Sequence, residues 1–304
     1  MPTDTPERIG PYRVREPIGR EGGAALFQAL DPSGRPVTLQ LLSARLLQDA
    51  TAYEQFRRDA DALARHHHPN LLNVLGTGQE GDRPYLVMEA FDGSPLSEVL
   101  RSRRLTSAEA FAVMKALCRG LAHAHEHGVV HRHVWPHALR VSSDVSQVKL
   151  SEFGFARVES MGMTGTINTG ALSLGAFHYL APEQTMGGRP VDHRTDIYSA
   201  GVVFQELLTG VAPGGRVTLP SQANSELPPA TDTVILKCME RNPVERYATA
   251  IDLLNDIARL EESMKVRLLS EIRGITGSGS RKALIAGVIL VLLALAAAGV
   301  LLLS

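Results

Sequence analysis

Cysteine is scarce in this chain. Cys118 and Cys238 are the only two cysteines, they stand far apart, and neither belongs to a C-x-x-C pair. That spacing excludes a disulfide framework and a zinc knuckle. It favours a reducing, cytoplasmic compartment for the folded part of the chain.

Blocks of like charge and an N-terminal apolar run are also missing. The 31 Lys and Arg nearly balance the 32 Asp and Glu, which leaves a formal net charge of −1. A balanced chain has no basic field to hold a nucleic-acid backbone, so we expect no nucleic-acid partner. The first residues include Pro2, Asp4 and Pro6, which is unlike a secretory signal peptide.

One long apolar run is present, at the C-terminal end. Residues 283–303 are drawn only from Ala, Leu, Ile, Val and Gly. At helical rise such a run spans about 30 Å, the thickness of a bilayer core. Arg281 and Lys282 precede it, and positive charge prefers the cytoplasmic side. We therefore expect a single-pass protein of the inner (cytoplasmic) membrane whose N-terminal domain faces the cytoplasm.

The rest of the chain divides into a strand-rich part and a helical part. Strands are expected over residues 14–42, broken at Gly22 and Gly23, and over residues 71–89, broken by further glycines. Helices are expected from apolar spacing of three and four residues. The predicted helices are residues 50–65, 107–127, 196–209, 231–240 and 248–273. The fold class expected is α+β, with a strand-rich N-lobe and a helical C-lobe.

Composition also sets the expected boundaries. The Gly- and Ser-rich residues 274–280 read as a flexible linker before the apolar run. The predicted organisation has four parts: an N-terminal tail (1–9), a two-lobed domain (10–262), a juxtamembrane helix and linker (263–282) and a transmembrane helix (283–303).

Several short motifs occur in a fixed order along the two-lobed domain. They are the glycine cluster after Ile18, His131-Arg-His133, Ser151-Glu-Phe-Gly154, Ala181-Pro-Glu183, Asp196-Ile-Tyr-Ser-Ala-Gly201 and Arg241-Asn-Pro-Val-Glu-Arg246. In this order they resemble the signature motifs of protein kinases. His68-Pro-Asn70 and the single apolar run after the domain resemble bacterial receptor-type serine/threonine kinases in particular.

By this resemblance, the positions with a chemical task depart from the family pattern. The lysine that grips the phosphates is Gln40, and its glutamate partner is Asp59. Three catalytic-loop residues are also replaced, because the catalytic aspartate is His133, the lysine after it is Trp135, and the metal-binding asparagine is Ala138. The metal-binding aspartate of the Asp-Phe-Gly motif is Glu152, which keeps a carboxylate on a longer stem.

The resemblance also implies where a nucleotide would lie. The pocket would be formed by Ile18, Gly19, Gln40, Met88, Glu89, Phe91 and Arg140. Arg140 stands where an apolar residue usually supports the purine. Its guanidinium could stack on adenine, or it could extend toward solvent on a strand that covers no ligand. Because Gln40 carries no charge, we expect ATP binding to be weak or absent, and we expect no cofactor and no Mg²⁺.

Positions with a structural task, in contrast, are retained. An apolar column of Leu63, Val74, His131 and Phe153, anchored by Asp196, would link the lobes, and Glu183 could pair with Arg246.

The chain is also rich in histidine near the catalytic loop. His123 and His127 are four residues apart, a spacing that can hold zinc or copper on one helix face. His125 and His131 stand where kinases commonly have histidine for packing. No cysteine and few carboxylates would complete a site, so no metal site is expected.

One retained residue suggests regulation. Arg132 corresponds to the arginine that commonly receives a phosphate from the activation segment. Four hydroxyl residues of that segment could carry it: Thr164, Thr166, Thr169 and Ser173. A local packing role for Arg132 is the alternative.

Two functions follow from this pattern. The first is a membrane-anchored pseudokinase, not an enzyme, that acts as scaffold or allosteric regulator of other proteins such as an active Ser/Thr kinase or its substrates. The alternative is a weak or atypical ATP-dependent Ser/Thr protein kinase. A metal-responsive sensor built on the histidines is a third possibility.

Overall fold

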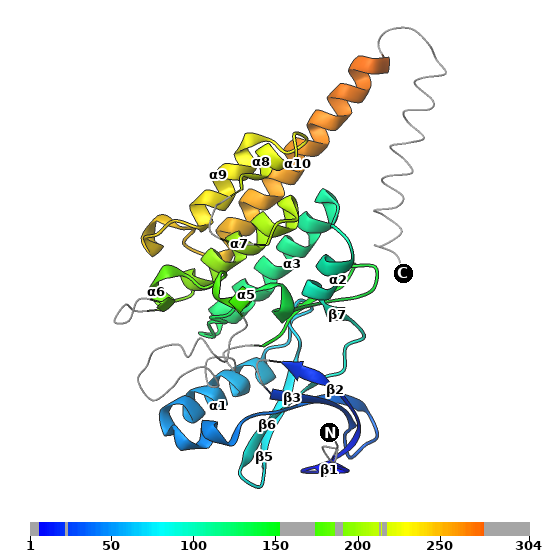
Figure 1. Cartoon of the computed structure of the whole chain (residues 1–304), viewed down its shortest axis with the longest axis vertical. Coiled ribbons are helices and arrows are strands. Elements are labelled where there is room, and N and C mark those ends of the chain that lie inside the picture. Colours follow the sequence, from blue (N-terminus) through cyan, green and yellow to red (C-terminus); the bar gives the residue numbers. More distant parts are fainter. Residues whose placement is uncertain are drawn as a thin grey trace.

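The computed structural model describes residues 6–21, 24–152, 174–185, 191–212, 214 and 218–276. Strands β1 to β6 and helix α1 form one lobe, and most of the helices form the other (Figure 1). The two-lobed α+β fold expected from the sequence is confirmed. The apolar run 283–303, Phe153 and the four candidate phosphorylation residues lie outside the described part of the chain.

The N-lobe is built on an antiparallel sheet of six strands in the order β1-β2-β3-β4-β6-β5. Both faces of this sheet are covered, because buried side chains of β3 contribute to two separate hydrophobic clusters. The strands are β1 (Arg8–Ile9), β2 (Tyr12–Glu21), β3 (Ala24–Leu30), β4 (Pro36–Leu41), β5 (Val74–Glu80) and β6 (Arg83–Glu89).

Glycine has two different roles in strands β5 and β6. The chain turns between them at Gly81, which has a φ of 58°. Gly78 lies within β5, where an added Cβ would approach the Tyr85 ring to 2.3 Å. Two strands were expected around Gly76, Gly78 and Gly81, and of these glycines only Gly81 lies between the strands.

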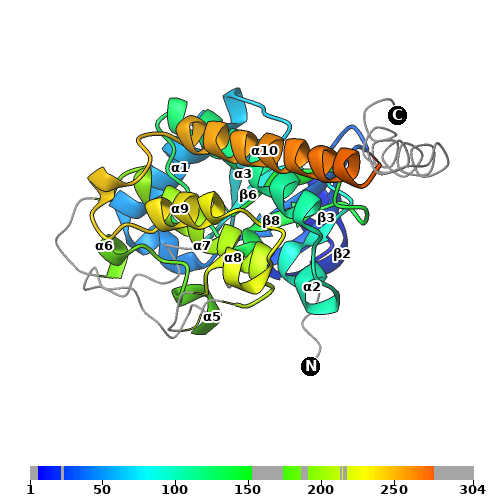
Figure 2. The ribbon, with the colours of Figure 1, turned by 90° about the horizontal axis from the view of Figure 1, so that it is seen from above.

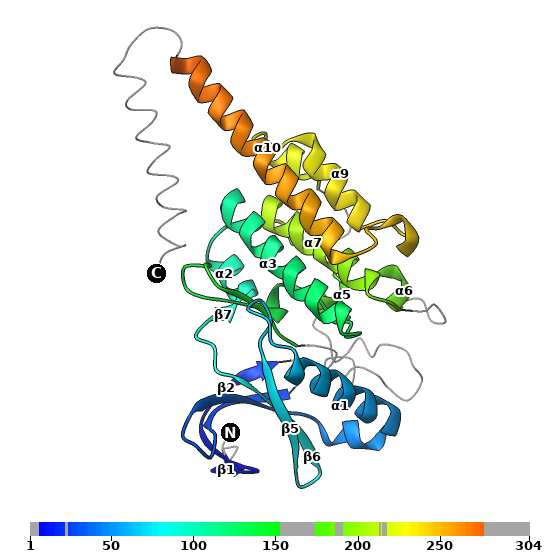
Figure 3. The same ribbon diagram turned by 180° about the vertical axis from the view of Figure 1, so that it is seen from behind.

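Helix α1 (Ala50–Arg65) is the helix of the N-lobe and matches its predicted bounds. Asp49 begins it, because its carboxylate accepts a hydrogen bond from the Ala52 N–H at 2.9 Å. Leu63 near its C-terminal end is buried. Figure 3 shows α1 beside β5, with which it packs.

The C-lobe is mainly helical. Its strands are β7 (Ser94–Pro95), β8 (Leu139–Val141) and β9 (Val148–Leu150). Its described helices are α2 (Leu96–Ser102), α3 (Ser107–Glu126), α5 (Leu174–Phe177), α6 (Pro182–Thr185), α7 (Arg194–Thr209), α8 (Pro220–Ala223), α9 (Pro229–Cys238) and α10 (Ala250–Thr276). The described residues also form three short 3₁₀ helices. They are η1 (Ala44–Gln48) before α1, η2 (Pro136–Ala138) before β8 and η3 (Pro243–Glu245) between α9 and α10.

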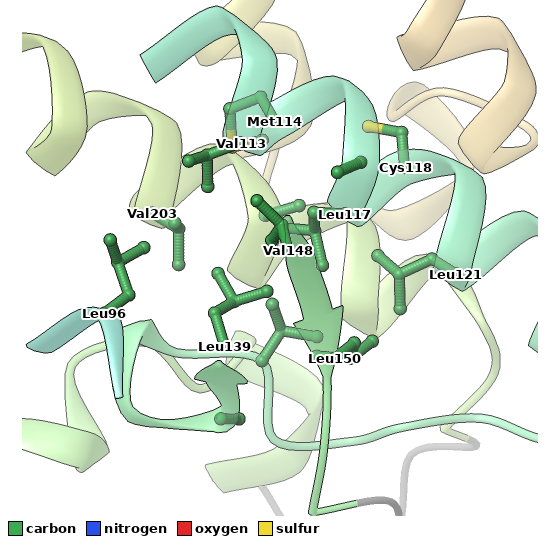
Figure 4. Close-up of a cluster of buried hydrophobic side chains, with 14 of the residues drawn as sticks. Leu96, Val113, Met114, Leu117, Cys118, Leu121, Leu139, Val148, Leu150 and Val203 are labelled. Carbon is green, nitrogen blue, oxygen red and sulfur yellow. The ribbon is translucent and has the colours of Figure 1, made fainter. Parts of the chain in front are cut away.

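Helix α3 lies at the centre of the C-lobe core. A capping box between Thr106 and Glu109 begins it, and apolar residues cover most of its circumference, as expected for a buried helix. Figure 4 shows its side chains against those of α2, α7, β8 and β9. The labelled residues are Leu96, Val113, Met114, Leu117, Cys118, Leu121, Leu139, Val148, Leu150 and Val203. Cys118 and Cys238 are both free and buried.

Helix α10 runs along α3, as the view from above shows (Figure 2). Lys115 of α3 and Glu261 of α10 form an ion pair across this contact at 2.5 Å. The helix continues without a break to Thr276, past the expected domain end at residue 262 and into the expected linker. Among the described residues, none of the helices combines the length and the apolar character needed to cross a bilayer.

Candidate active site

Asp196 at the start of α7 holds the catalytic-loop segment in place. It is fully buried and accepts hydrogen bonds from the backbone N–H groups of His131, at 2.8 Å, and Arg132, at 2.6 Å. The ring of His131 contacts the Ser151 carbonyl oxygen at 2.6 Å. These contacts join the catalytic loop to α7 and to the residue before Glu152, so the anchoring role expected for Asp196 is confirmed.

A second buried pair fixes the end of the described activation segment. Arg246 donates two hydrogen bonds to the Glu183 carboxylate, at 2.6 and 2.8 Å, and both residues are buried. Thr195 donates a third, at 2.9 Å. Burial would raise the pKa of Glu183, but the bonds from Arg246 and Thr195 lower it, so the carboxylate stays charged. The pairing expected from the sequence is confirmed.

Trp135 is the centre of an aromatic stack in the catalytic loop. Its ring lies between those of His133 and His137, each with a centroid separation of 5.1 Å. Its indole N–H donates to Glu152 Oε2 at 3.0 Å, and His137 Nδ1 lies 3.4 Å from Glu152 Oε1. The sequence gives no sign of this arrangement, in which Trp135 and His137 contact the Glu152 carboxylate while His133 stacks on Trp135.

The stack changes the charge state of its members. Burial lowers the pKa of His133 to about 4, so its imidazole is neutral at neutral pH. Burial would raise the pKa of Glu152, but the hydrogen bonds from His137 and Trp135 outweigh it and lower the pKa overall. Among the described residues, neither ring nitrogen of His133 has a hydrogen-bond partner.

Two of the three non-glycine residues with positive φ in the described part of the chain lie in this region, and the third, Val145, lies in the turn between β8 and β9. Arg132 has a φ of 69° and Glu152 has a φ of 62°, values that non-glycine residues adopt at some cost. The Arg132 carbonyl accepts a bond from the Gln184 side chain at 2.7 Å, which helps to hold the conformation. Strain of this kind is typical of functional sites.

Gln40 and Asp59 replace the usual ion pair of the N-lobe. Gln40 lies on β4 and is buried, and Asp59 on α1 is buried as well. The Asp59 carboxylate accepts a bond from Gln55 at 2.7 Å. Burial raises the pKa of Asp59, while the positive charges of Arg132 and Arg58 act against that rise. The charge of the catalytic-loop arginine, Arg132, therefore acts on Asp59, a relation that the sequence did not indicate.

The segment after β6 has the position of a nucleotide hinge. Met88 is buried, whereas the Glu89 carboxylate is used internally, by Lys149 at 2.7 Å and by the Asn73 N–H at 3.0 Å. Lys149 also lies over the Phe91 ring, 5.9 Å from its centroid. On strand β2, Ile18 is 45% exposed, and nothing lies within 4 Å of a Cβ built on Gly19. Because these side chains are buried, paired internally or exposed, the backbone of the hinge is the part of the segment that remains to face a nucleotide.

The structure gives Arg140 a specific partner. Its guanidinium Nη2 donates to the Gly93 carbonyl at 2.7 Å. The Arg140 side chain thus binds the backbone between the hinge and β7. Strand β7 pairs with β8, the strand that carries Arg140.

The histidines near α3 form a cluster held by backbone contacts. His66 and His127 stack with centroids 3.6 Å apart, and His68 and His123 lie 4.9 Å apart. Ring nitrogens of His123 and His127 contact the carbonyl oxygens of His66 and His123. Within the described part of the chain, no group of three or more potential ligands is arranged to hold a metal ion.

Comparison with known proteins places this site in a family. A family profile described as "Protein kinase domain" matches residues 12–268. The chain belongs to the protein kinase family. This kinase domain is 35% identical over 269 residues to the serine/threonine-protein kinase PknL of Mycobacterium bovis, covering 83% of the chain and 66% of PknL. It is 32% identical over 280 residues to the serine/threonine-protein kinase PknB of Mycolicibacterium smegmatis, covering 85% of the chain and 44% of PknB.

A solved structure agrees on the fold. The kinase domain of Mycobacterium tuberculosis PknI superposes with a TM-score of 0.71 at 21% identity, covering 86% of this chain and 99% of that domain. The aligned region spans 66% of PknL and only 44% of PknB, so those relatives extend well beyond the shared domain.

These relatives overturn three expectations. They bear the names of Ser/Thr protein kinases, and protein kinases transfer the γ-phosphoryl group of ATP with Mg²⁺. The expectations of a non-enzyme, of a scaffold or allosteric regulator, and of no cofactor were therefore wrong. Loss of the usual residue types does not by itself abolish their tasks, because His133 keeps a proton acceptor at the position of the catalytic aspartate.

The positions that bind metal in the family nevertheless do not fit the usual magnesium site. Ala138 offers no ligand atom, and the Glu152 carboxylate is already engaged by Trp135 and His137.

Proposed function

We propose that the chain is a weak or atypical ATP-dependent Ser/Thr protein kinase. Two features support this: its identity of 32–35% to named Ser/Thr kinases, and a catalytic loop that Asp196 holds in place. The observation that carries the proposal is His133 in the position of the catalytic aspartate. Its pKa is about 4, close to the value of about 3.9 for an ordinary aspartate.

A neutral imidazole with that pKa can take the place of the carboxylate. The catalytic aspartate accepts the proton of the substrate hydroxyl, and proton affinity is what that task requires. His133 is uncharged at neutral pH, and neither ring nitrogen has a hydrogen-bond partner among the described residues. Both nitrogens are buried in this structure, and we infer that one of them accepts the hydroxyl proton of a serine or threonine once the substrate is bound.

The phosphate contacts are weaker than in the family pattern. The Gln40 amide can donate a hydrogen bond to a phosphate oxygen, but it supplies no positive charge. ATP, when bound, supplies the phosphoryl group that is transferred. Because preorganised charge contributes most of the stabilisation in such sites, turnover should lie well below the range of about 1–100 s⁻¹ of ordinary kinases.

The location of the activity is also part of this proposal. Residues 283–303 would form the membrane helix, and Arg281 and Lys282 would keep the kinase domain at the cytoplasmic face of the inner membrane. The substrates would be proteins. A second Ser/Thr kinase that phosphorylates the activation segment is a further candidate partner.

The proposal is tested by phosphate transfer from labelled ATP. The full chain in neutral detergent would be incubated with Mg²⁺ or Mn²⁺ and a mixture of Ser- and Thr-containing peptides. The expected result is slow incorporation that is lost in His133→Phe and kept in His67→Phe, a change of an exposed histidine far from the catalytic loop. Equal incorporation in wild type and His133→Phe, or none in wild type, would refute the proposal.

A further inference from the structure

The helical lobe contains a cavity of about 370 Å³, within the size range of ligand sites. It lies between α2, the catalytic loop and the C-terminal end of α7. Its base is apolar and is formed by Leu100, Leu105, Trp135, Pro136 and Leu207.

Three arginines surround this base. Arg101, Arg103 and Arg104 all line the cavity and are all exposed. Arg103 is paired with Glu109 at 2.7 Å. The Arg101 guanidinium contacts the Ser97 carbonyl oxygen at 3.3 Å, and Arg104 lies against Gly210 at the end of α7. No salt bridge joins Arg101 or Arg104 to an acid within the described residues, and both line the cavity.

The cavity offers little negative charge in return. Its one acidic lining residue is Glu206, which accepts a hydrogen bond from the Tyr179 hydroxyl at 2.5 Å. Burial raises the pKa of Glu206, while the hydrogen bond from Tyr179 acts against that rise. Ser97 also lines the cavity, and its buried hydroxyl has no hydrogen-bond partner among the described residues. The cavity thus combines an apolar base, a free polar group and a positive rim.

We propose that this cavity binds an acidic segment of the protein substrate. A carboxylate of the segment pairs with Arg101 or Arg104, and a neighbouring apolar side chain lies on Trp135 and Leu207. The charge of the rim selects an anionic occupant. The location favours a substrate peptide, because the cavity lies next to the proposed proton acceptor. Trp135, which lines the cavity, stacks on His133 with ring centroids 5.1 Å apart. This inference rests on the proposed function, because only a kinase would make the bound segment a substrate. The binding itself requires no catalysis.

The chain carries its own probe for this site. Trp135 is the only tryptophan in the sequence, and it lines the cavity. Its fluorescence can therefore be followed while the full chain, in neutral detergent and without ATP, is titrated with short peptides. Three matched peptides would be used, each with one leucine and one threonine, in which the variable residues are Glu, Gln or Lys.

The Glu peptide should change the fluorescence saturably, with an affinity that falls as salt is raised. The combined change Arg101→Ala and Arg104→Ala should weaken binding at least tenfold. Arg65→Ala, which removes an exposed arginine from α1, should leave binding unchanged. Thermal melts of each variant would confirm that it folds.

Equal binding of the Gln peptide, or unchanged binding in the double arginine variant, would overturn the inference. A response to vesicles of anionic phospholipid but not to the Glu peptide would overturn it as well, since the occupant would then be lipid. Absence of phosphate transfer alongside selective, arginine-dependent binding would refute the proposed kinase activity but leave the binding site established.

Discussion

The buried His133 should make the folded state sensitive to acid in a defined pH window. Its pKa falls from 6.5 to about 4 on folding, so below pH 6.5 the unfolded chain binds a proton that the folded chain does not. Stability therefore rises with pH across this window and falls as the pH drops from about 6.5 toward 4. From these two values, the loss between pH 7.5 and pH 5 is about 2 kcal/mol.

The prediction concerns the difference between the wild type and His133→Phe, which replaces the imidazole by another ring. The charges of Glu152, His131 and His137 act on His133 in the wild type, and all three residues remain in the variant. Removing His133 should reduce the loss of unfolding free energy between pH 7.5 and pH 5 by about 2 kcal/mol, equivalent to roughly 4–8 °C in melting temperature for a domain of this size.

Urea denaturation at the two pH values, followed by circular dichroism, measures this difference. His67→Phe serves as the control, because it removes an exposed imidazole and should leave the pH dependence of the wild type intact. If wild type and His133→Phe lost the same free energy between pH 7.5 and pH 5, His133 would not be buried in its neutral form, and its assignment as proton acceptor would lose its basis.

Three further predictions concern other parts of the chain. Arg246→Ala should cost about 3–5 kcal/mol of unfolding free energy, because it leaves the buried Glu183 carboxylate without its partner; an effect below 1 kcal/mol in urea denaturation would contradict this. Deleting residues 283–304 should move the protein from the membrane pellet to the supernatant with an unchanged melting temperature, and a deleted form that still pellets would count against the anchor. Mass spectrometry of the native protein should find phosphate on at least one activation-segment hydroxyl, and Arg132→Ala should abolish the effect of that phosphate on activity; an unmodified segment would refute this. The candidate hydroxyls are Thr164, Thr166, Thr169 and Ser173.

Parts of the fold and the site follow directly from the sequence. The two lobes, the anchoring by Asp196 and the Glu183–Arg246 pair were predictable, because they depend on motifs whose order fixes their partners. Helix α10 was found from its apolar spacing, but its end at Thr276 was not, since helical contacts continued into residues with a linker composition.

The properties of the substituted positions could not be predicted in the same way. A histidine in place of the catalytic aspartate does not reveal its own pKa, which depends on burial and on Glu152. Likewise, Trp135 in the sequence does not indicate that its N–H will hold that carboxylate. These features arise from tertiary packing, so the substitutions alone suggested an inactive protein.

The most direct test of the account is the rate of phosphate transfer by His133→Asp and His133→Phe relative to the wild type. If His133 accepts the hydroxyl proton, the phenylalanine variant should lose activity by about 10²–10⁴-fold, the usual contribution of a general base. The aspartate variant should retain at least a tenth of the wild-type rate, because it restores the base of the family. Rates for His133→Phe equal to those of the wild type would contradict the account.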